Sequence, residues 1–179
     1  MKKTLVCILG LSGLLFACKQ PEPRTPMTYN SGTFIKESVE RNKNLVQNEE
    51  KIIQELIQKD STSKYYQSDL GFWYKYHEAN TNDTIVPKKG DIVKLDFEIF
   101  DIDHQLIYSK EETTPKVYAV DKQEIMVGLR HAVKLMHKGE TVSFIFPSHM
   151  AFGYLGDKDK IGINVPLICK VTLTDIKPE

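Results

Sequence analysis

Hydrophobic and polar residues alternate along three segments of the chain, as in strands with one face in the core and one in water. The clearest alternation runs through residues 92–100, and residues 141–146 and 166–176 repeat it. The apolar members of the first segment are Val93, Leu95, Phe97 and Ile99, which alternate with Lys94, Asp96 and Glu98. Two shorter apolar stretches, residues 72–79 with the single tryptophan and residues 115–120, predict further strands.

A helical repeat replaces this alternation in residues 33–59, where apolar side chains recur near 3.6 spacing between glutamates and lysines. The apolar members are Phe34, Ile35, Val39, Leu45, Val46, Ile52, Ile53, Leu56 and Ile57. A polar stretch at residues 40–44 interrupts them. Two interpretations of this long helix are open: it packs on its own domain, or it pairs with a second copy of the chain in a homodimer.

A second, shorter helix is predicted at residues 128–137. Its apolar stripe consists of Leu129, Ala132, Val133 and Met136, and Gly139 follows where a C-terminal cap is expected. Many strands and one short helix to cover them predict an α+β fold. We expect an antiparallel half-barrel sheet wrapped on the short helix and preceded by the long N-terminal helix.

The N-terminus has the pattern of a bacterial lipoprotein signal peptide. Two lysines precede an apolar run at residues 5–17 that is too short to span a bilayer. The run ends in Leu-Phe-Ala-Cys, which resembles a lipobox, so we expect a lipid on Cys18; the alternative is an ordinary secretory peptide cleaved near Ala17. The proline-containing residues 19–32 predict a tether. The protein is therefore expected in the cell envelope, lipid-anchored and facing the periplasm, at the outer rather than the inner membrane.

Composition limits the partners and the redox chemistry of the chain. Removing 17 of the 179 residues leaves 162, and the loss of two leader lysines turns 24 basic and 24 acidic residues into a net charge of −2. Without an excess of positive charge, binding to nucleic acid is not expected. Cys169 is the only cysteine left once Cys7 is removed and Cys18 carries lipid, so no intramolecular disulfide is expected.

No catalytic, metal or cofactor motif stands out. The five histidines share neither a helical face nor a metal-binding spacing, so neither a metal site nor a cofactor is expected. Asp157 and Asp159 fall on a predicted loop tip, where a solvated charge is the usual explanation. The glycine-hinged loop at residues 146–158 also holds Ser148 and His149, for which the sequence shows no partner.

Three glycine-punctuated motifs remain to be explained. They are P-K-x-G in "VPKKGDIVKLDFEIFD", followed by x-G-L-x-x-A-V-x-x-M-x-x-G-E and A-F-G-x-x-G in "KQEIMVGLRHAVKLMHKGETVSFIFPSHMAFGYLG". With "PLICKVTLTDI", they resemble the FKBP-type peptidyl-prolyl cis-trans isomerases in order and almost without gaps. The resemblance assigns residues 85–179 to the isomerase domain, after a signal peptide (1–17), a tether (18–32) and a helical arm with a lead-in strand (33–84).

The resemblance implies an apolar pocket for a proline-containing peptide, in which the backbone N–H of Met126 holds the substrate carbonyl. The implied pocket residues are Phe97, Ile107, Tyr108, Ile125, Met126, Leu129, Phe152, Ile161 and Cys169. The chain departs from the family pattern where Tyr108 replaces an aspartate, Leu129 a tryptophan and Cys169 a phenylalanine. The pocket stays apolar but loses aromatic walls and one carboxylate, so modest isomerase activity is expected.

The resemblance leads to two hypotheses of function. The first is a peptidyl-prolyl isomerase that assists the folding of exported, proline-containing polypeptides. With its lipobox and arm, the chain is also similar to FKBP-type lipoproteins associated with gliding motility in Bacteroidetes, which suggests a link to motility or secretion. The alternative is a catalytically weak or inactive chaperone or scaffold subunit of such a machine.

Overall fold

The computed structural model of the chain describes residues 31–179. The chain divides into two compact units, Met1–Ser38 and Val39–Glu179, and only residues 31–38 of the first unit are described. The predicted signal peptide, Cys18 and nearly all of the predicted tether therefore lie outside the described residues. The sheet and everything that surrounds it belong to the second unit.

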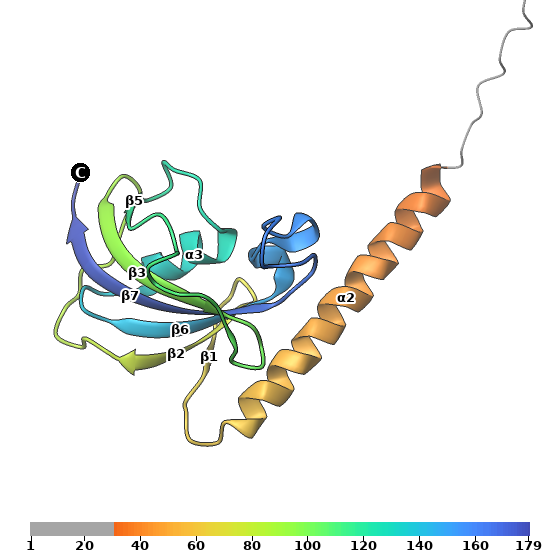
Figure 1. Cartoon of the computed structure of the whole chain (residues 1–179), viewed down its shortest axis with the longest axis horizontal. Helices are drawn as coiled ribbons and strands as arrows, with labels where there is room; N and C mark the ends of the chain where they lie inside the picture. The colour runs from red at the N-terminus through yellow and green to blue at the C-terminus, as the bar shows by residue number, and fades with distance from the viewer. Residues whose placement is uncertain (1–30) are drawn as a thin grey trace, which may run out of the picture. The chain divides into compact units, whose positions relative to one another are not determined.

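Within the described residues, seven strands form one antiparallel sheet in the order β1-β2-β6-β7-β3-β4, with β5 paired to β3 (Figure 1). The strands are β1 (Tyr66–Gln67), β2 (Trp73–Glu78), β3 (Ile92–Phe100), β4 (Leu106–Tyr108), β5 (Val117–Ala119), β6 (Thr141–Phe146) and β7 (Leu167–Lys177). This sheet and the helices confirm the predicted α+β fold. The two-residue strand β1 lies in a stretch for which the residue pattern predicts no strand.

The longest pairing of the sheet joins β3 to β7, with Phe97 opposite Val171 and Ile99 opposite Cys169. Along β3 the residues Val93, Leu95, Phe97 and Ile99 are buried, while their neighbours are exposed or half-buried. This alternating burial confirms the half-buried strand that the sequence pattern predicts.

Strand β6 differs from the prediction because all six of its residues are buried. Phe144 and Phe146 point into the main core, whereas Ile145 packs on the other face with Ile53 and Ile168. The expectation of one solvated face was wrong for this strand, because helices cover the sheet on both sides.

The short helix is smaller than predicted. Helix α3 spans Val127–Ala132 and continues as a single 3-10 turn, η2 (Val133–Leu135), after which the backbone is extended. Gly139 is not the helix cap: its φ is +86°, and its N–H donates to the Leu173 carbonyl at 2.7 Å in the turn that leads into β6. The helical backbone therefore ends before Met136, the last residue of the apolar stripe, and the chain after it bonds to the sheet.

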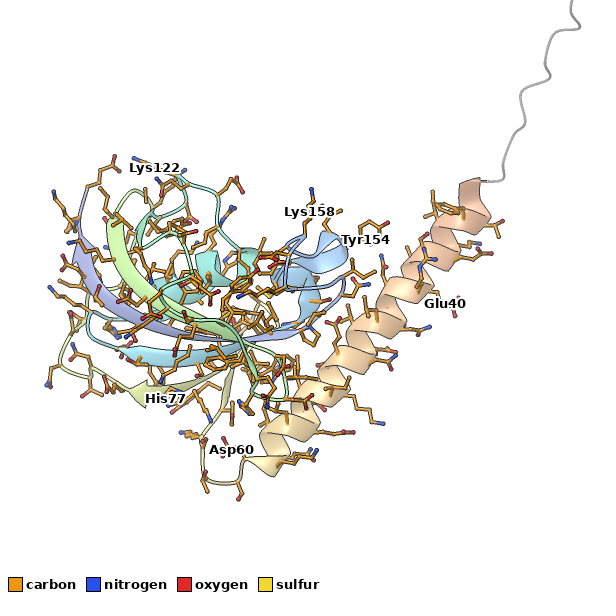
Figure 2. The ribbon with its side chains drawn as sticks, in the orientation of Figure 1. Glu40, Asp60, His77, Lys122, Tyr154 and Lys158 are labelled. Carbon is orange, nitrogen blue, oxygen red and sulfur yellow. The ribbon has the colours of Figure 1, made fainter. Side chains whose placement is uncertain are left out.

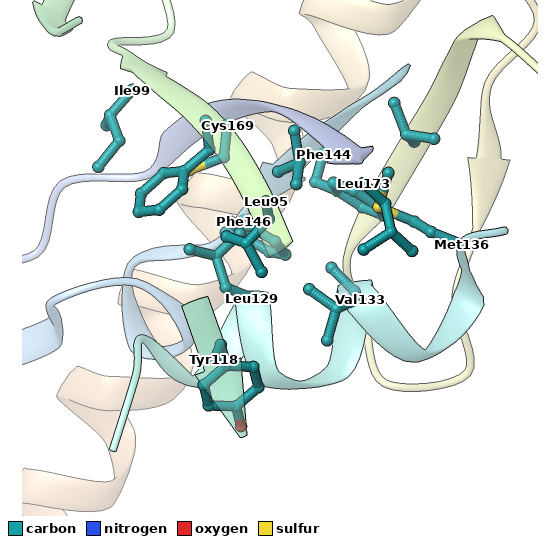
Figure 3. Packing of buried hydrophobic residues seen from close by; sticks show 14 of the residues in the cluster. Leu95, Ile99, Tyr118, Leu129, Val133, Met136, Phe144, Phe146, Cys169 and Leu173 are labelled. Atoms are coloured by element: carbon teal, nitrogen blue, oxygen red, sulfur yellow. The ribbon is translucent and has the colours of Figure 1, made fainter. Parts of the chain in front are cut away.

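Helix α3 lies against the concave face of the sheet (Figure 1). Figure 3 shows Leu129 and Val133 directed toward sheet residues such as Leu95, within one cluster of buried side chains. The helix comes this close because residue 128 is glycine: a Cβ there would lie 2.5 Å from a ring carbon of Phe146. In the G-L pair of the motif, Gly128 thus allows the close approach of the helix, and Leu129 fills the core beneath it.

The long helix α2 spans Ser31–Lys59, beginning two residues earlier than predicted. Its C-terminal turns pack on the convex face of the sheet, where Ile53 is fully buried against Trp73, Ile145 and Ile168. For these turns, the structure supports packing on the helix's own domain. The apolar residues nearer its start remain exposed; they are Phe34, Ile35, Val39 and Val46.

Asp60, just beyond the end of α2 (Figure 2), fastens this end of the helix to the sheet. Its carboxylate accepts hydrogen bonds from Lys75 Nζ (2.7 Å) and Tyr65 Oη (2.9 Å). These bonds, that of Lys75 first, hold the pKa of Asp60 well below its usual range. The C-terminal part of α2 is thus held on the sheet by the burial of Ile53 and by the hydrogen bonds of Asp60.

Candidate functional site

A cleft of about 520 Å³ opens on the concave side of the sheet, between β3, the segment after β4, the start of α3 and the loop that follows β6. Its lining residues are Phe97, Ile99, Tyr108, Glu112, Thr113, Thr114, Pro115, Glu124, Ile125, Met126, Leu129, Phe152, Asp157 and Asp159. The cleft has an apolar interior and a polar rim, as is usual for sites that bind small ligands or peptides.

Six of the nine predicted pocket residues line this cleft: Phe97, Tyr108, Ile125, Met126, Leu129 and Phe152. The other three do not. Cys169 is fully buried in β7 between β3 and β6, and Ile161 is buried at the end of the loop that follows β6. Ile107 is half-buried and packs against the main core. The three residues thus pack in or against the core that also contains Phe97 and Leu129, without lining the cleft.

Leu129 forms the floor of the cleft and is almost completely buried. At the start of the same helix, Met126 accepts a hydrogen bond from the Arg130 N–H at 3.0 Å through its carbonyl. The position of Met126 at the helix N-cap directs its own N–H away from the helical ladder. The geometry is therefore compatible with the predicted role of this N–H as a donor to a substrate carbonyl.

Another wall of the cleft is formed by a loop of two 3-10 turns, η3 (Ser148–Met150) and η4 (Gly153–Leu155), with Phe152 between them. Gly156 closes the second turn with a φ of +63°, and a Cβ at this position would lie 2.4 Å from the Ile161 carbonyl oxygen. Only glycine fits there, which explains the last glycine of the A-F-G-x-x-G motif.

Tyr108 and Asp157 form a hydrogen bond between the β4 side of the cleft and the loop. The Tyr108 hydroxyl donates to Asp157 Oδ2 at 2.6 Å and lies 3.2 Å from Asp159 Oδ2. The bond to Asp157 and, less strongly, burial raise the pKa of Tyr108 to about 12. The prediction of Asp157 as a merely solvated charge was wrong, because its partner is 49 residues away in sequence.

The pKa of Asp157 is lowered in spite of its partial burial. Burial alone would raise it, but hydrogen bonds from Tyr108 and from the N–H groups of Asp159 and Ile161 outweigh that effect. The Ile161 N–H donates to Asp157 Oδ1 at 2.8 Å, so Asp157 also holds the end of the loop in shape.

The rim of the cleft is acidic, a feature that no pattern in the sequence predicts. Glu112, Glu124, Asp157 and Asp159 all contribute to the lining. Glu112 is paired with Lys160 at 2.5 Å and Glu124 with Arg130 at 3.3 Å, exposed pairs that contribute little to stability and that leave Asp157 and Asp159 as the excess negative charge. These residues come from three loops, and no spacing in the sequence indicates that they meet.

The cleft holds no arrangement for acid–base or nucleophilic chemistry, and residues 31–179 contain no cluster of side chains suited to a metal ion. Rotation about an X-Pro bond needs neither, because no covalent bond is made or broken. The barrier is ~18–20 kcal/mol for amides, and a 10⁴-fold acceleration requires lowering it by about 5.5 kcal/mol. An apolar cleft supplies this by binding the twisted imide better than the planar one.

Comparison with known proteins agrees with this geometry. FkpA from Escherichia coli is similar with a TM-score of 0.60 and 21% identity, over 99% of this chain and 83% of that chain. A peptidyl-prolyl cis-trans isomerase from Pseudomonas syringae pv. tomato also gives 0.60, with 17% identity over 76% and 96% of the two chains. The three FKBP domains of wheat FKBP73 give 0.56, with 21% identity over 65% and 50%. At these identities the likeness shows the fold.

The family itself is shown by a sequence model. The model of the FKBP-type peptidyl-prolyl cis-trans isomerases matches residues 83–174, about half of the chain. The match includes β3 to β6, α3, the loop with Phe152 and most of β7, and so takes in every residue of the cleft. The chain belongs to the FKBP-type peptidyl-prolyl cis-trans isomerases.

Proposed function

We propose that this isomerase works in the bacterial cell envelope, where a lipid on Cys18 anchors it with its cleft facing the periplasm. The observation that carries this proposal is the lipobox-like Leu-Phe-Ala-Cys after a short apolar run. Among residues 31–179, no helix is long and apolar enough to cross a membrane.

Labelling with a fatty acid in the native host tests the anchor. Cys18→Ser is expected to accumulate as an unprocessed precursor without label, while the wild type is processed and labelled. Separation of inner and outer membranes then locates the labelled protein, which we expect in the outer membrane. Equal processing and labelling of both proteins would refute the lipid anchor.

The proposed substrates are exported polypeptides whose folding waits for an X-Pro bond. The apolar interior of the cleft suits a prolyl ring, and its acidic rim favours peptides with basic residues beside the proline. A peptide series X-Pro with X as Leu, Lys or Glu tests both points. The rate constant kcat/KM should be highest for Lys and lowest for Glu, and this difference should shrink at high salt.

We propose a role in gliding motility or secretion on the basis of the similarity to gliding-associated lipoproteins. A strain without the protein should spread less on agar and recover with the wild-type gene. Complementing this strain with a gene that encodes Phe152→Ala separates the two hypotheses of function. If it fails to restore spreading although the protein is present, isomerase activity is what the cell needs.

The scaffold alternative is favoured by Tyr108, which stands where the family pattern has an aspartate. Its hydroxyl is hydrogen-bonded to Asp157 at the edge of the cleft, so it is not free to meet a substrate. Under this alternative, the Phe152→Ala gene restores spreading fully. The purified wild type would then also fail to accelerate proline-limited refolding while remaining folded.

We also propose that the exposed apolar residues on the first turns of α2 pair with a second copy of the chain. Phe34 and Val39 are 70% and 61% exposed, which is unusual for a solvated helix face. Sedimentation of the wild type should give a dimer, and Val39→Glu should shift it to the monomer. A wild type that sediments as a monomer at all concentrations would exclude the homodimer.

A further inference from the structure

The start of the loop with Phe152 is bound to a glutamate of the long helix. Glu49 of α2 and Ser148 of η3 are 4% and 2% exposed, although 99 residues separate them. Glu49 Oε2 accepts the Ser148 N–H at 2.8 Å, and Glu49 Oε1 accepts the Ser148 hydroxyl at 2.6 Å. Figure 1 shows the loop between β6 and β7 beside the middle of α2.

A buried carboxylate at this place is costly unless it is well bonded. Removing an ionised group from water opposes folding, and hydrogen bonds to both oxygens are what compensates. The bonded N–H belongs to the first residue of a 3-10 turn, which has no partner within the turn. Glu49 therefore supplies a partner to a backbone group that no residue of the loop itself satisfies.

Ser148 is linked to Phe152 through a short, hydrogen-bonded stretch of backbone. The Met150 N–H donates to the Pro147 carbonyl at 2.9 Å, and the Ala151 N–H donates to the Ser148 carbonyl at 3.0 Å. Met150 is itself buried and belongs to the main core. Phe152 follows directly, so a shift of Ser148 moves this wall of the cleft.

We propose that Glu49 is a positioning residue for catalysis: through Ser148 it sets the place of the Phe152 ring, so that the helical arm is part of the isomerase site. This inference rests on the assignment of the cleft as the isomerase site. It gives the arm a catalytic role that is separate from membrane tethering and from pairing with a second copy.

The test compares variants of the purified protein in an exchange-NMR assay that yields kcat and KM for an X-Pro peptide. Glu49→Ala removes both acceptors and should lower kcat/KM about tenfold, mostly through kcat, because a small misplacement of a site wall weakens transition-state binding. Glu49→Gln keeps an acceptor for the Ser148 N–H and should retain most of the rate. The amide signals of Phe152 and Gly153 should shift in Glu49→Ala.

Two controls separate positioning from stability. Glu40→Ala removes a carboxylate that points into solvent (Figure 2) and should change nothing. Leu173→Ala truncates a buried side chain of β7 that belongs to the main core, not to the cluster under α2, and lies outside the cleft lining; it should lower stability but keep kcat/KM at matched folded fraction. Equal losses in Leu173→Ala and Glu49→Ala would overturn the proposal, as would a wild-type rate in Glu49→Ala.

A further variant separates this inference from the assignment of the cleft. Phe152→Ala should have a lowered kcat/KM whether or not Glu49 positions the loop. If Phe152→Ala is as fast as the wild type, the cleft is wrongly assigned and the role of Glu49 falls with it. If kcat/KM is lowered in Phe152→Ala but equals the wild-type value in Glu49→Ala, the cleft assignment stands and only the inference about Glu49 is refuted.

Discussion

The ring of Phe152 offers the most direct test of how this cleft works. It is one of three aromatic side chains in the lining, with Phe97 and Tyr108. Phe97 is buried in β3, and the Tyr108 hydroxyl is engaged by Asp157, so Phe152 is the aromatic wall with most freedom to meet a substrate. Phe152→Leu removes the flat ring while keeping an apolar side chain of similar volume.

The size of the effect follows from what the ring contributes. Aromatic contacts add ~0.5–1.5 kcal/mol beyond the area that they bury, which corresponds to a twofold to tenfold loss of kcat/KM for Phe152→Leu. The ring is only half-buried in the free protein, so this swap should cost less than ~1.5 kcal/mol of folding free energy. Phe152→Ala should lose at least as much activity and more stability.

A protease-free isomerisation assay on X-Pro peptides, with folded fractions matched by circular dichroism, measures these losses. We expect kcat/KM to fall in the order wild type, Phe152→Leu, Phe152→Ala. Wild-type rates in both folded variants would refute it, because catalysis would then not depend on this wall. An inactive but folded wild type would remove the basis of the prediction and favour the scaffold hypothesis.

Three further predictions concern the floor, the packing and the loop. Leu129→Trp restores the ring that the family carries in the floor and should raise kcat/KM; an unchanged value in a fully folded variant would show that the floor does not limit the rate. Gly128→Ala should destabilise the protein by ~1–3 kcal/mol in urea unfolding, since the new Cβ meets the ring of Phe146, and a wild-type midpoint would contradict that contact. The lowered pKa of Asp157 stabilises the fold above the ordinary value of 3.8, and this contribution is lost as the pH falls through the lowered pKa. Asp157→Asn should therefore flatten the acid side of the stability profile, and a profile parallel to that of the wild type would show that its bond to Tyr108 is not maintained in solution.

Elements with a local pattern of residues could be predicted before the structure was known. The alternation in β3 appears as alternating burial, because a strand turns successive side chains to opposite faces. The long helix follows from a 3.6-residue repeat, and the glycines at positions 128 and 156 could be recognised as parts of motifs. The motifs also brought six cleft residues together, since residues aligned with a family inherit its spatial arrangement.

Contacts between residues far apart in the chain became visible only in the folded molecule. Glu49 reads in sequence as one of several solvated glutamates of a helix, and its burial on Ser148 depends on how α2 docks. The Tyr108–Asp157 bond joins the end of β4 to the loop after β6 in the same way. Strand β6 is fully buried because other elements pack on both of its faces, and α3 ends at Ala132 where the chain turns back toward the sheet. Local patterns record the period of one element, whereas these contacts depend on the free energy of packing several elements together.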